Sequence, residues 1–147
     1  MNNILWKFAG AWRGHEQIQS SKWGAGGLAL SSVTSELQFD DRLLVQDYAA
    51  QRDGKDWFDA HAVFSFDAND GSYRLFWFDS LGFVPEQAAS GTWNGESLTF
   101  IRISPRGQTR HVYTPVSDYE YSMRLESSFD GGANWILVME GRYSRHA

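Results

Sequence analysis

Turn signals at short, regular intervals are the feature that most constrains how this chain can fold. They are Asp53-Gly54, Asn69-Asp70-Gly71, Asn94-Gly95, Arg106-Gly107 and Asp130-Gly131-Gly132. All five supply residues that tolerate positive φ and therefore favour tight hairpin turns. The runs between them are rich in β-branched and aromatic residues, which are typical of strands. The pattern predicts a succession of antiparallel hairpins.

A short helix is expected over Asn3 to Phe8, where Ile4, Leu5 and Phe8 face the same way and Gly10 ends the segment. No later segment shows a sustained helical period. We predict strands over residues 11–19, 27–39, 43–50, 57–66, 73–79, 87–93, 97–103, 109–115, 119–128 and 134–143.

About ten strands in sequential order suit an up-and-down arrangement. Closing such a sheet removes the two edges that would otherwise be open to aggregation. A barrel of about 8 to 10 strands has room for side chains and one small ligand. We therefore predict a single domain over residues 1–147, an all-β, closed antiparallel up-and-down barrel with a short N-terminal helix.

Two of the predicted strands carry apolar residues on both faces. In 73–79 one face carries Leu75 and Trp77 and the other Phe76 and Phe78, and 135–143 is similar. Strands of this kind are usually covered on both sides. The N-terminal helix or another subunit would have to cover the outer wall, so we expect a homodimer.

The segment from Leu28 to Phe39 changes its apolar parity. Leu28 and Leu30 share one parity, and Val33 and Leu37 take the other, with Ser31-Ser32 between them. A β-bulge at the two serines would explain the change and help to bend the strand.

Charge and composition exclude several classes of function. A net charge of -5 with scattered basic residues argues against a nucleic-acid binder. The chain has no cysteine, no apolar run long enough to span a membrane and no leader-like N-terminus, so we expect a cytoplasmic protein without a membrane partner. His15, His61 and His111 lack the close spacing of zinc ligands, and no catalytic motif occurs, so no metal and no catalytic residue is predicted.

Several short motifs spread over most of the chain resemble one family. They are Gly10-Ala11-Trp12-Arg13-Gly14, Leu44-Val45-Gln46-Asp47-Tyr48, Trp77-Phe78-Asp79-Ser80, Gly91-Thr92-Trp93-Asn94-Gly95, Asp130-Gly131-Gly132-Ala133-Asn134-Trp135 and Met139-Glu140-Gly141-Arg142-Tyr143. As a set they resemble an uncharacterised bacterial family of unknown function with a calycin, lipocalin-like barrel. The resemblance implies the barrel, with Trp12 closing one end, and implies no activity.

The opening motif around Trp12 is also similar to that of nitrobindin, a haem-carrying ten-stranded barrel whose iron is bound by a histidine of the final strand. Here the final strand has no histidine, so haem would lack its expected axial ligand unless His61 or His111 replaced it. We expect no cofactor.

Ser128-x-Asp130-x-Gly132-x-x-Trp135 is similar to the Asp-box hairpin of sialidases. A single copy is interpreted as a turn in which Asp130 accepts hydrogen bonds from nearby amides and Trp135 packs beneath it.

Carboxylates within apolar strands are the best functional lead, because such groups are usually paired or functional. The candidates are Glu36, Asp47, Asp79 and Glu140, with Arg102, Arg124 and Arg142 as available partners. A buried ion pair and a ligand-binding acid are both open interpretations. Asp79-Ser80 is the first choice for a pocket mouth.

Aromatic residues make up 16 % of the chain, and such residues line apolar pockets. We predict non-enzymatic binding of a small apolar or aromatic ligand in the barrel. The predicted ligand-binding residues are Trp12, Phe64, Phe76, Trp77, Asp79, Tyr121, Met123 and Glu140. One alternative is an isomerase, hydratase or hydrolase using Asp79, Glu140 or His111 as acid or base. The other is a filled barrel that acts as a protein-interaction module.

Overall fold

Ten antiparallel strands form one closed barrel in the computed structural model, which describes residues 3–22, 24–82 and 85–146. The strands are β1 (Gly10–Ile18), β2 (Gly27–Gln38), β3 (Leu43–Arg52), β4 (Lys55–Asp67), β5 (Ser72–Asp79), β6 (Ala89–Trp93), β7 (Leu98–Ser104), β8 (Gly107–Ser117), β9 (Glu120–Ser128) and β10 (Ile136–Arg145). Each strand pairs with its neighbours in sequence, and β1 pairs with β10 to close the sheet. The predicted up-and-down barrel is confirmed.

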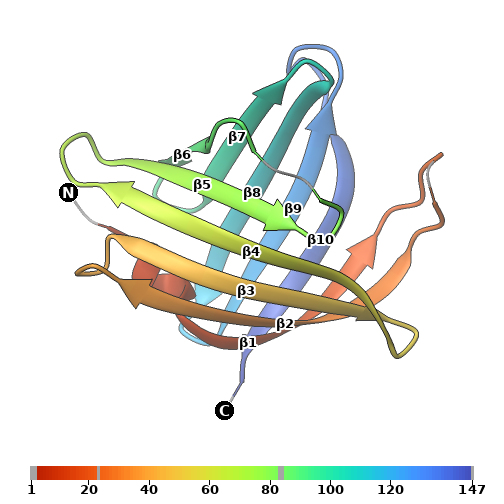
Figure 1. The fold of residues 1–147 in the computed structure, drawn as a ribbon, viewed down its shortest axis with the longest axis horizontal. Coiled ribbons are helices and arrows are strands. Elements are labelled where there is room, and N and C mark those ends of the chain that lie inside the picture. The colour runs from red at the N-terminus through yellow and green to blue at the C-terminus, as the bar shows by residue number, and fades with distance from the viewer. Residues whose placement is uncertain (1–2, 23, 83–84, 147) are drawn as a thin grey trace.

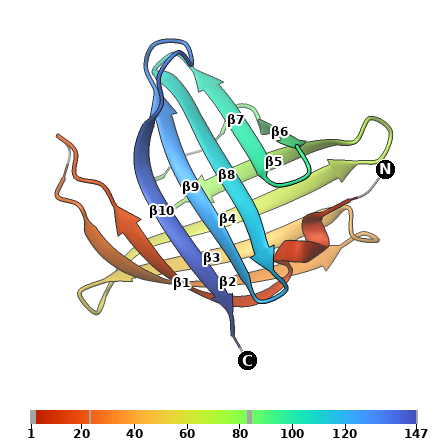
Figure 2. The same ribbon diagram turned by 180° about the vertical axis from the view of Figure 1, so that it is seen from behind.

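The barrel is strongly curved (Figure 1). Strands β1 to β5 cross β6 to β10 at a steep angle, so that the two halves of the closed sheet face each other across the core. The β1–β2 hairpin extends beyond the rest of the wall, beside β10 (Figure 2). No helix among the described residues is long and apolar enough to cross a lipid bilayer.

The N-terminal helix is one turn of 3-10 helix, η1 (Leu5–Phe8), and it closes one end of the barrel. Leu5 and Phe8 are buried, and the Phe8 ring meets Tyr121 edge to face at 5.2 Å between centroids. Of the two covers considered for the outer wall, the N-terminal helix is therefore excluded. Packing inside the barrel end removes the apolar surface of Leu5 and Phe8 almost completely from water.

Trp12 lies at this same end. Its indole N–H donates to the Phe8 carbonyl at 3.0 Å, and the exposed guanidinium of Arg145 lies 4.2 Å from the ring centroid. The structure thus places Trp12 at one end of the barrel, as the family resemblance implied.

Strand β2 keeps one parity over its whole length. Ala29, Ser31, Val33 and Ser35 are buried, and the pairing of β2 with β1 and β3 runs through the two serines without a shift in register. The predicted bulge at Ser31-Ser32 is therefore wrong. The inward positions of β2 include Ser31 and Ser35, which are small and polar. A pattern based on apolar side chains alone therefore suggests a change of face that does not occur.

Candidate functional site

A buried carboxylate lies on the inner wall where the barrel closes. Glu16 of β1 is only 1 % exposed. The phenol of Tyr48, from β3, lies 2.6 Å from both carboxylate oxygens, and the phenol of Tyr143, from β10, donates to Oε2 at 2.6 Å. Two phenol donors compensate the loss of water around this carboxylate, and they tie three strands together.

Small residues make room for this Glu16–Tyr48–Tyr143 cluster. Ala29 and Gly141 are the cross-strand neighbours of Glu16 on β2 and β10. A Cβ atom added at Gly14 would lie 2.5 Å from the Tyr143 ring, and one added at Gly141 would lie 2.6 Å from the Tyr143 hydroxyl. Glycine at both positions lets the Tyr143 ring lie flat against the wall and reach Glu16.

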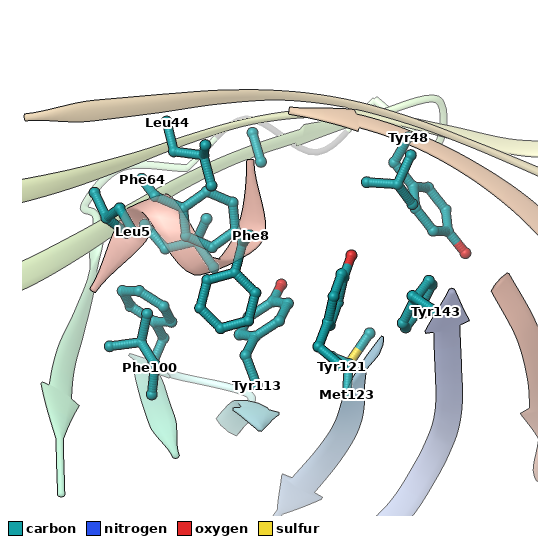
Figure 3. Close-up of a cluster of buried hydrophobic side chains, with 14 of the residues drawn as sticks. Leu5, Phe8, Leu44, Tyr48, Phe64, Phe100, Tyr113, Tyr121, Met123 and Tyr143 are labelled. Carbon is teal, nitrogen blue, oxygen red and sulfur yellow. The ribbon is translucent and has the colours of Figure 1, made fainter. Parts of the chain in front are cut away.

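The phenols of the cluster stay protonated. Burial and then the Glu16 carboxylate raise the pKa of both Tyr48 and Tyr143 well above the ordinary value for tyrosine. Tyr121, whose pKa is raised mainly by burial, stacks on Tyr143 with centroids 4.7 Å apart. Figure 3 shows these tyrosines pointing into the interior beside the apolar side chains around Phe8. The single proton of each phenol of the cluster is therefore held in its hydrogen bond to Glu16.

Away from the helix, several inward side chains are still partly exposed. Apolar side chains there pack against the core and keep part of their surface open: Ile18, Phe58, Trp77 and Leu125. The Trp77 ring lies 5.5 Å from His111 and 6.5 Å from Phe58 between centroids. These rings form an aromatic cluster that continues to Tyr48, whose ring lies 6.4 Å from that of Trp77.

His111 is held neutral beside Trp77. Burial, and then the positive charge of Arg102, lower its pKa to about 4. Its Nδ1 atom has no hydrogen-bond partner among the described residues. A neutral imidazole with an unsatisfied nitrogen can accept or donate a single hydrogen bond, depending on its tautomer.

Asp79 orients the Trp77 ring. The indole N–H of Trp77 donates to Asp79 Oδ2 at 3.0 Å, and Asp79 Oδ1 accepts from the Leu81 amide at 3.0 Å. Burial lowers the pKa of Arg102, and the nearby Asp79 charge opposes this effect. The pocket mouth predicted at Asp79-Ser80 and ligand binding by Asp79 both stay predictions.

The structure separates the predicted binding residues into two groups. Those on the inner side of the wall are Trp12, Phe64, Trp77, Asp79, Tyr121 and Met123. Phe76 and Glu140 are exposed on the outer face, so placing them in the barrel interior was wrong. Strict alternation explains both corrections, because Leu75 and Trp77 occupy the inner positions of β5 and Gly141 and Tyr143 those of β10.

The other polar candidates lie away from the interior. His61 is on the outer face, as its parity predicts, and its Nδ1 lies 2.8 Å from the Asp47 carboxylate. Glu36 is exposed. No group of three potential metal ligands occurs in the part of the chain that the structure describes.

The hydrogen bonds predicted for the Asp130 turn are confirmed. Asp130 accepts hydrogen bonds from the Ser128 hydroxyl at 2.8 Å and from the amide and side chain of Asn134 at 2.9 and 2.8 Å. The guanidinium of Arg110 lies 4.0 Å from the centroid of the Trp135 ring, and the packing of this ring beneath the turn stays a prediction.

The residue that sequence reasoning missed is Glu16. The signal was present, because Glu16 has the same parity as Trp12 on the first strand, and Trp12 was placed inside. Extending that alternation by four residues puts a carboxylate in the core.

The solved structures that are similar to this barrel include the following two. One is an S-type phycobiliprotein lyase from Guillardia theta, with a TM-score of 0.69 and 7% identity over 96% of this chain and 89% of that chain. The other is Rv2717c from M. tuberculosis, with a TM-score of 0.70 and 13% identity over 96% and 94% of the two chains. Similarity at this level of identity shows the fold alone.

No curated protein matches the chain. The family resemblance noted in the short motifs is confirmed over nearly the full length. The pattern of the family described as "Protein of unknown function (DUF1579)" matches residues 1–145, and the chain belongs to this family.

Proposed function

We propose that the barrel interior binds a small, largely apolar or aromatic molecule that enters beside Trp77. The observation that carries this proposal is a difference between the two ends. At the helix end the inward aromatic side chains are buried, whereas Phe58 and Trp77 keep part of their surface open. An apolar opening with a few convergent polar groups is the usual form of a small-molecule site.

His111 gives the site a polar contact. An unsatisfied buried nitrogen costs free energy, and a ligand that hydrogen bonds to it recovers this cost. Because the imidazole is neutral, it suits an uncharged polar group such as a hydroxyl or carbonyl better than an anion. A flat aromatic molecule stacked on Trp77 would lie beside this ring.

Tryptophan fluorescence with a panel of flavonoids, lipids and hemin tests the proposal. At least one aromatic compound is expected to quench the emission saturably, and Trp77→Leu should weaken its binding about tenfold. Phe76→Leu, on the outer face of the same strand, is the matched control and should leave binding unchanged. If no compound binds to the folded wild-type protein, or if both variants bind equally well, the proposal fails.

An enzymatic role at the same opening is the second candidate. Its support is the neutral His111 next to Trp77, which could act as a base, and the phycobiliprotein lyase shows that an enzyme can have this barrel fold. Glu140, on the outer face, drops out of this scheme. Turnover of a bound compound that His111→Phe abolishes without loss of binding would favour the enzyme over the carrier.

We also propose that the protein forms a homodimer through the outer face of β5. Phe76 and Phe78 are exposed there, side by side with the outer residues of β4. Light scattering should give a dimer mass at micromolar concentration and a monomer mass for Phe78→Ser. A wild-type monomer would refute this proposal.

A further inference from the structure

The β1–β2 hairpin turns away from β8 to β10 (Figures 1 and 2). Outward residues of these strands line a groove on the outside of the barrel. Its volume is about 420 Å³. That volume falls within the range of about 300–1,000 Å³ that is typical of small-molecule sites. The groove is separated from the interior by the wall itself.

The strand register shows how the groove is built. Outward residues line up in two rows across neighbouring strands. One row is formed by Leu30, His15, Arg142 and Ser122, and the other by Leu28, Gln17, Glu140 and Arg124. Each row therefore runs from an apolar end on β2 to a polar end on β10 and β9.

The apolar end is open to solvent. Leu28 and Leu30 are 72% and 57% exposed, although they are adjacent outward positions of one strand. On the far side of the groove, Val112 of β8 also lines it and is only 8% exposed. Covering the two leucines with an aliphatic chain would remove apolar surface from water.

The polar end contains an exposed cation, Arg142. Glu140 lies directly opposite Arg124, which also approaches Glu126 at 4.0 Å. Arg142 lies opposite His15 and Ser122 and has no ion pair or hydrogen bond of its side chain to another described residue. In a chain with a net charge of -5, this exposed guanidinium stands out as a site for an anion.

We propose that this outer groove binds a small amphipathic carboxylate, with its aliphatic body on Leu28 and Leu30 and its carboxylate at Arg142. The hydrophobic wall and the cation lie in the same row, so one molecule can contact both. A peptide strand fits less well, because β1, β2, β9 and β10 already pair on both sides and offer no open edge.

Decanoate is the probe, followed by amide chemical shifts in ¹⁵N NMR. Saturable shifts are expected in β1, β2 and β10. Decanol, which lacks the charge, should bind about three- to tenfold more weakly. Raising the salt concentration from about 0.05 M to about 0.5 M should weaken the binding of decanoate and leave the binding of decanol unchanged, because salt screens exposed charges.

Variants separate this groove from the interior. Arg142→Gln and Leu30→Ser should each weaken decanoate about three- to tenfold. Arg13→Gln, an exposed arginine of β1 outside the groove, and Trp77→Leu, at the interior opening, should not.

Equal binding of decanol and decanoate, no effect of Arg142→Gln, or shifts confined to interior residues would each overturn the proposal. The proposal would also be overturned if decanoate failed to bind while the amide chemical shifts of the groove residues changed with protein concentration. The groove would then be an interface between two copies of the chain. None of these outcomes depends on whether the interior binds an aromatic ligand.

Discussion

The Tyr143 hydroxyl donates a 2.6 Å hydrogen bond to the Glu16 carboxylate, and the two residues are 127 positions apart in the chain. Tyr143 lies on β10, the last strand, and Glu16 on β1, the first strand, and these two strands pair where the barrel closes. Tyr48 adds a third strand to the same carboxylate. The pairing of β1 with β10 that closes the sheet therefore also places a hydrogen-bond donor next to the buried carboxylate.

Removing one phenol hydroxyl should weaken the fold. Tyr143→Phe is expected to lower the free energy of unfolding by about 1.5–3 kcal/mol, because Glu16 loses one of its two donors. The control is Tyr119→Phe, an exposed tyrosine that should change stability by less than about 0.5 kcal/mol. Urea denaturation measures both. Equal stability of the two variants would show that the cluster contributes nothing.

The packing of the Tyr143 ring against Gly14 can be tested with a second substitution. Gly14→Ala should destabilise the protein by about 1–3 kcal/mol, because the new methyl group meets the Tyr143 ring and the Ser31 hydroxyl. Gly24→Ala is the matched control, since a Cβ atom there meets nothing within 4 Å. Thermal unfolding should separate the variants, and a Gly14→Ala protein as stable as the control would contradict the packing described for Tyr143.

The strands could be predicted from sequence because their signals are local. Turn residues such as Asp53-Gly54 mark where the chain reverses, and ten strands in sequential order leave closure as the simplest topology. The position of the helix could not be predicted in this way. Whether Leu5 and Phe8 pack inside or outside depends on the width of the barrel end, which no local pattern encodes.

The site was predicted less well for a related reason. Phe76 and Glu140 were chosen by residue type, whereas the sheet sorts residues by parity. Glu16 was overlooked because a glutamate between a histidine and a glutamine suggests a solvated strand. Only the register with Tyr48 and Tyr143 shows that its partners come from β3 and β10.

The Asp130 turn should make the hairpin sensitive to acid. Hydrogen bonds from Asn134 and then Ser128 lower the pKa of Asp130 to about 2 from an ordinary 3.8. A lowered pKa means that the turn is stabilised above about pH 4 and that this stabilisation is lost as the pH falls toward 2. Carboxyl NMR should find the low midpoint in the wild type and a higher one in Asn134→Ala. A midpoint near 3.8 in both proteins would refute the role of these hydrogen bonds.

His111 should impose a pH dependence in a different window. Its pKa is about 4 in the folded protein and 6.5 in an ordinary environment, so the unfolded chain takes up a proton first. Stability is therefore complete above about pH 6.5 and falls by up to roughly 3 kcal/mol as the pH drops to 4. The side chain of His111→Gln cannot titrate. Any advantage of the wild type over this variant in free energy of unfolding should therefore shrink, or reverse in favour of the variant, as the pH falls from 6.5 to 4. Carboxylates titrate in both proteins and cancel in the difference. If the two stability curves run parallel between pH 6.5 and 4, His111 is not held neutral by its surroundings, and the uncharged polar contact assigned to the interior opening is lost with it.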